Sequence, residues 1–263
     1  MNRSVRHGEQ LARWVSAERV SPITYDLAVA RVIVYIDGFN LYHGVKEFMQ
    51  SERNLRSWKW LDIVELSRRL VPKDDVRLVR YFTAKVQSLA ADPAMAQRQQ
   101  AYLRAVSADP KVSVHFGKFM VQKKRMPLID PPGRFRLKLV QLLGVDLKSH
   151  SDGNVSASVL RIEEKGTDVS LGAHLVADAF RGEFDKALVI SNDTDLCEPV
   201  RIVVAELGRD VIVANPRGHR EPANALRKVA TETRQIRTAV LFESQLPESV
   251  DDEHGSVSKP LTW

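Results

Sequence analysis

Apolar residues along this chain form short runs typical of strands and longer stretches with helical spacing. The runs Val32–Ile36 and Ala187–Ile190 are short and are bounded by polar residues, which predicts two buried strands. Between residues 58 and 70 the apolar positions recur at nearly helical spacing and stop before Pro72, which predicts a helix that ends there.

The same pattern continues as an alternation of strands and helices. Further strands are predicted at Val76–Val86, Val112–Val121, Ser158–Glu163 and Val211–Ala214. Helices are predicted at Leu41–Met49, Pro93–Val106, Val169–Phe180, Leu196–Leu207 and Glu221–Lys228. This order predicts an α/β fold in which a mostly parallel central sheet carries helices on both faces.

Three segments depart from the alternation and set the expected domain limits. Residues 1–30 are interpreted as an N-terminal appendage with a short amphipathic helix, and residues 31–248 as a single domain. Within that domain, residues 122–156 contain several Pro and Gly residues and are expected to form an irregular insertion. The polar residues 249–263 are expected to form a flexible tail.

Composition is typical of a soluble globular protein. Of 263 residues, 44% are hydrophobic and 27% are charged. No apolar run is long enough for a membrane span, and the N-terminus lacks the apolar core of a secretory signal. One cysteine, Cys197, excludes an internal disulfide and a zinc site built from several thiolates. The sequence therefore predicts a cytoplasmic protein without a membrane partner.

Positive charge is concentrated in the expected insertion. The net charge is +6, and the stretch from Gln122 to Lys148 accounts for most of it, because its only acids are Asp130 and Asp146. Such a concentration suits a polyanion, although a solvated surface loop has the same composition. The residues predicted to contact nucleic acid are Lys123, Lys124, Arg125, Arg134, Arg136 and Lys138.

Acidic side chains follow two of the predicted strands. Asp37 follows the first strand, and Asp193 and Asp195 follow Ile190. The carboxyl ends of parallel strands meet at one edge of a sheet, so these acids are expected to lie together with Asp168, which stands at a helix start. Clustered carboxylates repel one another unless a cation neutralises them, and oxygen ligands favour Mg²⁺ or Mn²⁺. Each acid taken singly also fits an ordinary helix cap or turn.

Three sequence blocks resemble the signature of a known family. The blocks are Val34-Tyr-Ile-Asp-Gly-Phe-Asn40, Lys165-Gly-Thr-Asp-Val169 and Val189-Ile-Ser-Asn-Asp-Thr-Asp-Leu196. In this order they resemble the NYN family of PIN-like nucleases, over residues 32 to about 216. The resemblance implies a PIN-like three-layer α/β/α sandwich and metal-dependent hydrolysis, usually of RNA.

The resemblance also implies roles for individual residues. The predicted catalytic and metal-binding residues are Asp37, Asp168, Asp193 and Asp195. The predicted supporting residues are Asn40, Ser191, Asn192, Lys165, His174 and Asp178. Among these, Asn192 stands where many members have Gly, and Lys165 is a candidate contact to a substrate phosphate. His174 and Asp178 are four residues apart and share one helix face, either near the site or in a structural role.

The predicted function is that of a metal-dependent ribonuclease, an endonuclease-type hydrolase with RNA as its partner; a homodimer is an open possibility. The first alternative is a non-catalytic nucleic-acid-binding or regulatory module with the same fold. The second is a small-molecule oxidoreductase that uses NADH. It ranks last because Asp37-Gly-Phe-Asn40 follows the first strand where a dinucleotide site would have G-x-G-x-x-G.

Overall fold

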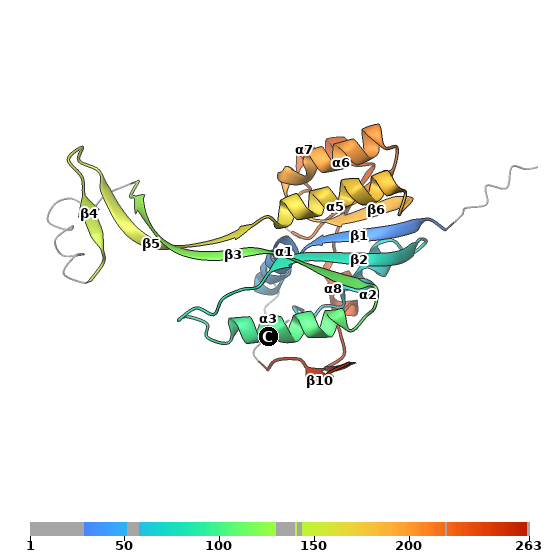
Figure 1. Cartoon of the computed structure of the whole chain (residues 1–263), viewed down its shortest axis with the longest axis horizontal. Coiled ribbons are helices and arrows are strands. Elements are labelled where there is room, and N and C mark those ends of the chain that lie inside the picture. Colours follow the sequence, from blue (N-terminus) through green and yellow to red (C-terminus); the bar gives the residue numbers. More distant parts are fainter. Residues whose placement is uncertain (1–28, 52–57, 130–139, 141–143, 219, 262–263) are drawn as a thin grey trace, which may run out of the picture.

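An eight-stranded sheet forms the centre of the protein, seen in a computed structural model (Figure 1). The structure describes residues 29–51, 58–129, 140, 144–218 and 220–261. The strands lie in the order β4-β5-β3-β2-β1-β6-β7-β8. Their bounds are β1 (Arg31–Asp37), β2 (Asp75–Ala84), β3 (Val112–Pro127), β4 (Leu147–Ser149), β5 (Val155–Lys165), β6 (Lys186–Ile190), β7 (Asp210–Asn215) and β8 (Glu232–Gln235).

The strands from β3 through β2, β1, β6 and β7 to β8 run parallel to their neighbours. Only β5 and β4, at one edge, are antiparallel. The prediction of an α/β fold with a mostly parallel central sheet is therefore confirmed. Since β1 lies between β2 and β6, it ends at the middle of the carboxyl edge of the sheet.

The alternation of side chains along β1 supplies both hydrophobic cores. Val32, Val34 and Ile36 pack into one cluster, and Ile33 and Tyr35 pack into the other. Helices cover both faces, as Figure 1 shows. On the first face lie α1 (Gly38–Ser51), α2 (Ile63–Leu70), α3 (Met95–Ser107) and α8 (Thr238–Glu243). On the second lie α5 (Thr167–Arg181), α6 (Cys197–Arg201) and α7 (Asn224–Val229).

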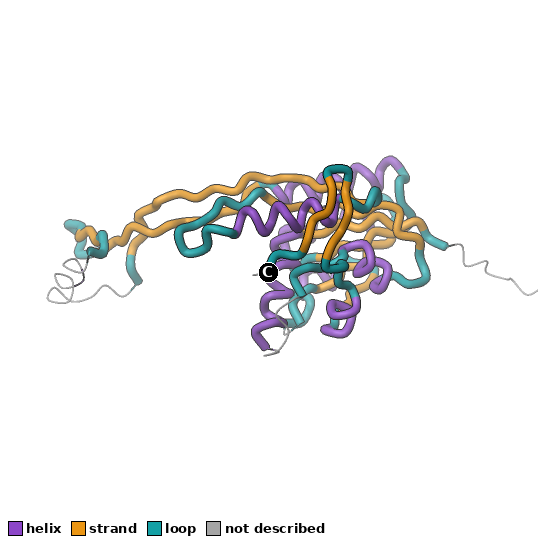
Figure 2. The backbone as a smooth tube through the Cα atoms, turned by 90° about the horizontal axis from the view of Figure 1, so that it is seen from below, coloured by secondary structure: helices purple, strands orange, loops and turns teal. Residues whose placement is uncertain are grey.

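Part of the expected irregular insertion is a regular antiparallel ribbon. The outer half of β3 pairs with β5 from Lys118↔Lys165 to Pro127↔Ser156. The ribbon projects from the body, with β4 near its tip (Figures 1 and 2). Three of the predicted nucleic-acid contacts lie outside the described residues, namely Arg134, Arg136 and Lys138.

Two further segments differ from the expectation. The helix predicted over Leu196–Leu207 consists of a 3-10 turn (Thr194–Leu196), α6 and a π-helical turn (Ile202–Glu206), because apolar spacing predicts a helix but not its hydrogen-bond register. The expected flexible tail contains a hairpin of β9 (Ser249–Asp252) and β10 (Gly255–Ser258). Buried Val257 and an ion pair between Asp252 and Arg104 of α3 hold this hairpin on the body.

The N-terminal limit of the described structure lies just before β1. Residues 1–28, most of the expected appendage, lie outside the described residues. In the part of the chain that the structure describes, none of the helices has the length and apolar character needed to cross a membrane.

Candidate active site at the carboxyl edge of the sheet

Asp37 ends β1 and is nearly enclosed by protein. Its carboxylate accepts a hydrogen bond of 2.9 Å from the backbone N–H of Asn40 and one of 3.0 Å from the hydroxyl of Ser191. Helix α1 begins at Gly38, directly after Asp37, because the chain turns back over the sheet there. A Cβ atom on Gly38 would lie 2.7 Å from the Tyr81 ring, so this close turn needs glycine.

The turn after β6 brings the second group of predicted residues to the same edge. The hydroxyl of Ser191 accepts a 3.1 Å hydrogen bond from the backbone N–H of Asp193. The carboxylate of Asp193 in turn accepts a 3.0 Å hydrogen bond from the backbone N–H of Asp195 and caps the short helical turn. Asp193 therefore has the capping role that an isolated acid at such a place commonly has, while also facing the other acids.

Asn40 and Asn192 connect three loops around this edge. The side-chain oxygen of Asn40 accepts a 3.3 Å hydrogen bond from the backbone N–H of Asn192. The side-chain oxygen of Asn192 accepts one of 2.8 Å from the backbone N–H of Ala223, before α7. Both side chains are thus held by backbone contacts, which fixes the positions of the loops that carry Asp37 and Asp193.

Asp168 reaches the same edge from the first turn of α5. The residue that caps this helix is Gly166, which adopts a left-handed conformation with φ of 87°, so Asp168 is not the cap. Burial raises the pKa of Asp168, and the negative charges of Asp193 and Asp195 raise it further. The structure therefore brings all four predicted acids into one electrostatic group.

Glu164 is a fifth acid in this group, and sequence reasoning missed it. It lies near the end of β5 and forms a hydrogen bond with the hydroxyl of Thr167. Burial raises the pKa of Glu164 to about 8, with further contributions from Asp37 and Asp168. In the sequence, only its position directly before the Lys165 block marks Glu164 as a candidate site residue. The predicted strand ends at Glu163, whereas β5 continues to Lys165 and brings Glu164 to the sheet edge.

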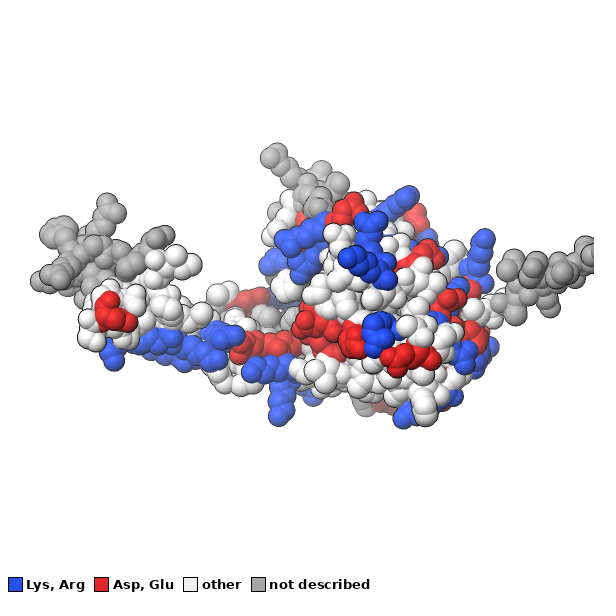
Figure 3. All heavy atoms as spheres, turned by 90° about the horizontal axis from the view of Figure 1, so that it is seen from above, with Lys and Arg blue, Asp and Glu red and all other residues white. Residues whose placement is uncertain are grey.

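The five acids that we call the acid edge are Asp37, Glu164, Asp168, Asp193 and Asp195. Burial raises the pKa of Asp37 to about 6, and Asp168 and Asp193 add to the effect. Burial and mutual repulsion thus raise the pKa values of acids in this group toward neutral pH, which suits proton transfer. Figure 3 shows acidic side chains gathered where the ribbon joins the body and basic side chains farther out along the ribbon.

The acid edge has oxygen donors of the type that Mg²⁺ and Mn²⁺ prefer. Among the residues that the structure describes, however, no three His, Cys, Asp or Glu side chains are placed so that they could hold one metal ion together. Oxygen atoms of Asp37 and Asp193 are instead occupied by hydrogen bonds from the chain. The Mg²⁺ or Mn²⁺ site therefore stays a prediction.

His174 and Asp178 lie on one face of α5, but this face packs on the sheet. Asp178 is fully buried and accepts hydrogen bonds of 2.8 Å from the Tyr35 hydroxyl and from Arg80. The ring of His174 lies 4.4 Å from the ring of His115, centre to centre. This buried network connects α5 to β1, β2 and β3. None of the hydrogen bonds and ring contacts just described involves an acid-edge residue.

Four of the described basic residues on the ribbon, Lys123, Lys124, Arg125 and Lys165, lie near acids. Arg125 lies 2.7 Å from Asp146, and Lys123 lies 3.7 Å from the same carboxylate. Lys124 lies 3.9 Å from Glu163, and Lys165 lies 4.0 Å from it. The roles predicted for these bases, contacts with nucleic acid or with phosphate, stay predictions.

A cavity of about 100 Å³ lies on the α1 side of the acid edge. Gly38, Phe39 and Tyr81 line it, so the residue that follows Asp37 also forms a wall of the cavity. The remaining walls come from α1, α3, the segment before α2, the end of β2 and the residues after it. Sequence reasoning missed the cavity because its aromatic residues fit the pattern of an ordinary core.

Comparison with known proteins gives one relative of curated function. No family model matches this chain. The chain is 27% identical over 257 residues to 6-hydroxy-3-succinoylpyridine 3-monooxygenase HspA of Pseudomonas putida, a match that covers 89% of this chain and 75% of that protein.

Solved structures resemble the chain only loosely. A Vibrio parahaemolyticus protein of unknown function has a TM-score of 0.43 at 14% identity, covering 80% of this chain and 94% of that one. The sirtuin Sir2Tm bound to a propionylated peptide has a TM-score of 0.30 at 10% identity, covering 81% of this chain and 90% of that one.

The monooxygenase relative overturns the predicted function. A metal-dependent ribonuclease hydrolyses a phosphodiester, whereas a monooxygenase is an oxidoreductase, so both the reaction and the enzyme class of the prediction are wrong. A cluster of carboxylates does not by itself specify phosphodiester chemistry, so the nuclease resemblance of the three blocks does not fix the reaction. The alternative that ranked last, a small-molecule oxidoreductase, agrees better with this relative.

Proposed function

We propose that this chain is an oxidoreductase of the monooxygenase type that acts on a small aromatic molecule. The observation that carries the proposal is the 27% identity to HspA, which covers 89% of the chain. The name of that relative supplies both the proposed reaction type and the proposed pyridine-like substrate. A monooxygenase inserts one oxygen atom of O₂ into its substrate and releases the other as water. Each turnover then consumes two electrons and two protons, and the reductant we propose is NADH.

The turn after β1 does not suit the common mode of dinucleotide binding, in which the pyrophosphate lies against the first strand–helix turn. That mode needs a glycine-rich turn at which the pyrophosphate approaches the backbone. Here the buried carboxylate of Asp37 stands at the strand end, and Tyr81 fills the space beside Gly38. We therefore place no nicotinamide or flavin dinucleotide at this turn and route no step through one.

The role proposed for the acid edge is proton transfer. Asp37 is buried, hydrogen-bonded by Ser191 and adjacent to Gly38 in the cavity wall. A carboxyl group held in such a position can accept or donate a proton at a substrate hydroxyl. The same network keeps its oxygen atoms in a fixed orientation, which is the contribution a protein makes to positioned acid–base chemistry.

We also infer that the body is a PIN-like α/β/α sandwich of the NYN kind, used here for different chemistry. Helices on both faces of a mostly parallel sheet support this inference, as do the three sequence blocks converging on one edge. One scaffold commonly hosts unrelated reactions, so this fold is compatible with oxidoreductase activity.

Turnover assays test the proposed function. The full chain is incubated with 6-hydroxy-3-succinoylpyridine and NADH, with and without added flavin, Mg²⁺ or Mn²⁺, while O₂ and NADH are followed. We expect substrate-dependent consumption of O₂ and NADH in equal amounts. Asp37→Asn should lower the rate about 100-fold, the usual scale of acid–base catalysis, whereas Asp185→Asn, an exposed acid paired with Arg31, should leave it unchanged. No O₂ consumption under any of these conditions would contradict the proposal.

A further inference from the structure

A pocket lined by arginines lies at the β8 end of the sheet. Its volume is about 350 Å³, within the usual range of about 300 to 1,000 Å³ for ligand pockets. The loop after β7, the strand β8 and Arg227 of α7 form its walls. Because β7 and β8 run parallel to their neighbours, this loop leaves the sheet at the carboxyl edge, where open α/β sheets commonly bind ligands.

Two amide side chains hold the loop of this pocket in place. Asn215 is fully buried, and its side chain donates hydrogen bonds of 3.3 Å and 2.6 Å to the carbonyl oxygens of Arg217 and Arg220. The side chain of Gln235 donates one of 2.8 Å to the same Arg217 carbonyl. The backbone of the loop is therefore fixed before a ligand binds, which lowers the entropic cost of binding.

Arg220 and Arg227 line the pocket with unpaired guanidinium groups. Both side chains are exposed, and neither forms an ion pair or a hydrogen bond with the residues that the structure describes. Arg234 also lines the pocket, but Glu232 lies 2.6 Å from it and neutralises its charge. Among the described residues of the wall, only Glu221 is acidic. Two free cations against one acid favour an anionic ligand.

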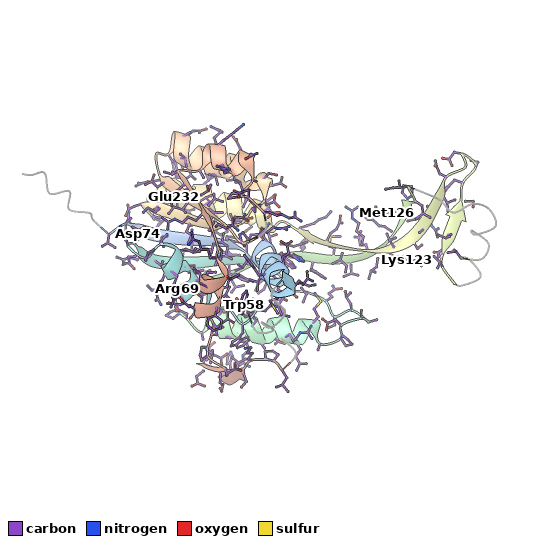
Figure 4. All side chains as sticks on the ribbon, turned by 180° about the vertical axis from the view of Figure 1, so that it is seen from behind. Trp58, Arg69, Asp74, Lys123, Met126 and Glu232 are labelled. Atoms are coloured by element: carbon purple, nitrogen blue, oxygen red, sulfur yellow. The ribbon has the colours of Figure 1, made fainter. Side chains whose placement is uncertain are left out.

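The pocket is connected to the acid edge and separate from the basic ribbon. The backbone N–H of Ala223, at the end of the loop, donates a 2.8 Å hydrogen bond to the side chain of Asn192. Figure 4 shows Glu232 on the body, well away from the ribbon residues Lys123 and Met126. A ligand in this pocket would therefore lie on the same side of the sheet as the proposed acid–base residues.

We propose that this pocket binds the pyrophosphate of a nucleotide, with one phosphate at Arg220 and the other at Arg227. A planar guanidinium group can bind two phosphate oxygens through parallel hydrogen bonds. The inference rests on the proposed function and deepens it, since the pyrophosphate would be that of the reductant NADH. It also gives the dinucleotide a place on the sheet edge that avoids Asp37 and the turn after β1.

Other ligands match fewer of these features. A nucleoside without phosphate leaves both guanidinium groups unmatched, and a single phosphate group engages them less fully than a pyrophosphate does. Adenosine and AMP are therefore the informative comparison ligands for ADP, because the three compounds share a base and a ribose and differ in the number of phosphates.

Calorimetric titration of the full chain with ADP, NADH, AMP and adenosine tests the pocket separately from turnover. We expect ADP and NADH to bind about tenfold more tightly than AMP, and adenosine to bind more weakly still. Arg220→Gln and Arg227→Gln should each weaken ADP and NADH about tenfold, the usual effect of losing one hydrogen-bonded contact to a charged group.

Glu221→Gln should act in the opposite direction. It removes the acid from the wall, so ADP and NADH should bind about threefold more tightly, a change that damage to the fold would not produce. The matched control is Arg77→Gln near the amino end of β2, an exposed residue at the opposite edge of the sheet, which should change none of the affinities. Circular dichroism verifies that each variant is folded.

The outcomes separate the two proposals. Unchanged affinity for ADP and NADH in both arginine variants, or no binding of either compound at millimolar concentration, overturns the pocket assignment even if turnover is observed. Binding of ADP without binding of NADH overturns the assignment to the reductant. Binding of both that depends on Arg220 and Arg227, without O₂ consumption, retains the pocket and rejects the monooxygenase function.

Discussion

The hydroxyl of Ser191 donates a 3.0 Å hydrogen bond to the carboxylate of Asp37, joining two sequence blocks that lie 154 residues apart. The bond connects the ends of the adjacent parallel strands β1 and β6. Ser191 is itself fixed by the backbone N–H of Asp193, so the three residues form one hydrogen-bonded chain. The acid edge is therefore built from long-range contacts that the parallel sheet imposes.

Asp37→Asn should stabilise the fold while lowering activity. Burial raises the pKa of Asp37 to about 6, above its unfolded value of about 3.9. The folded state then binds more protons between these values, so the contribution of Asp37 to stability is lost as pH rises from about 4 through 6. At pH 7.5 the variant should gain on the order of 3 kcal/mol, measured by urea denaturation.

That gain should vanish at pH 4, where the folded wild type is protonated at this position. A variant that is less stable than the wild type at pH 7.5 would show that the hydrogen bonds to Asn40 and Ser191 outweigh the burial of charge.

His115 should make the fold sensitive to mild acid. Burial lowers the pKa of His115 to about 4, and the charges of His174 and Arg80 lower it further, while Asp178 opposes the shift. The unfolded chain binds a proton near pH 6.5, so stability should be lost as pH falls from about 6.5 to 4. His115→Gln should reduce the difference between melting temperatures at pH 7.5 and pH 5, and His254→Gln in the exposed turn between β9 and β10 serves as control. An unchanged difference in both variants would contradict this assignment.

The buried pair of Arg80 and Asp178 should matter far more for stability than an exposed pair. Asp178→Asn leaves Arg80 without its carboxylate and should cost on the order of 3 kcal/mol of unfolding free energy. Asp185→Asn breaks the solvent-exposed pair with Arg31 and should cost less than about 1 kcal/mol. Comparable losses in the two variants, measured by chemical denaturation, would speak against a structural role for Asp178.

Nucleic-acid contact is predicted for the basic residues of the ribbon. We expect single-stranded RNA to bind with an affinity that falls roughly tenfold between 50 and 200 mM salt, as for a few phosphate contacts. Replacing Lys123, Lys124 and Arg125 together with Gln should abolish this binding in a mobility-shift assay. Binding that survives the triple replacement, or no binding by the wild type at 50 mM salt, would refute the prediction.

A divalent cation at the acid edge would stabilise the fold by mass action. If Mg²⁺ or Mn²⁺ binds there, 10 mM of the ion should raise the melting temperature of the wild type, because it neutralises carboxylates that repel one another. Asp193→Asn should lose this response, and Asp185→Asn should keep it. Equal responses in all three proteins would assign the effect to nonspecific screening.

Much of the fold was predictable because apolar spacing reports strands and helices directly. The runs at Val32–Ile36 and Ala187–Ile190 became β1 and β6, and the rule for parallel strands brought Asp37 and Asp193 to one edge. The ribbon was not predictable in the same way. Its strands mix half-buried and solvent-exposed positions, so β3 and β5 carry no continuous apolar pattern to show where they end.

The candidate site was only partly predictable for the same reason. Glu164 lies on an antiparallel strand, outside the rule that identified the other acids. Trp58 and Tyr102 resemble core residues in sequence, and only packing leaves a cavity between them. The reaction was not predictable at all, because the same carboxylates suit metal binding, proton transfer or helix capping.

Isotope labelling tests the central claim most directly. The full chain is supplied with NADH, 6-hydroxy-3-succinoylpyridine and ¹⁸O₂ in unlabelled water, and the product is examined by mass spectrometry. A monooxygenase transfers one ¹⁸O atom to each product molecule, and Asp37→Asn should lower the yield without changing the label. Product that takes its oxygen only from water, shown by the reverse experiment in H₂¹⁸O, would show that O₂ is not the oxygen donor and would contradict the account.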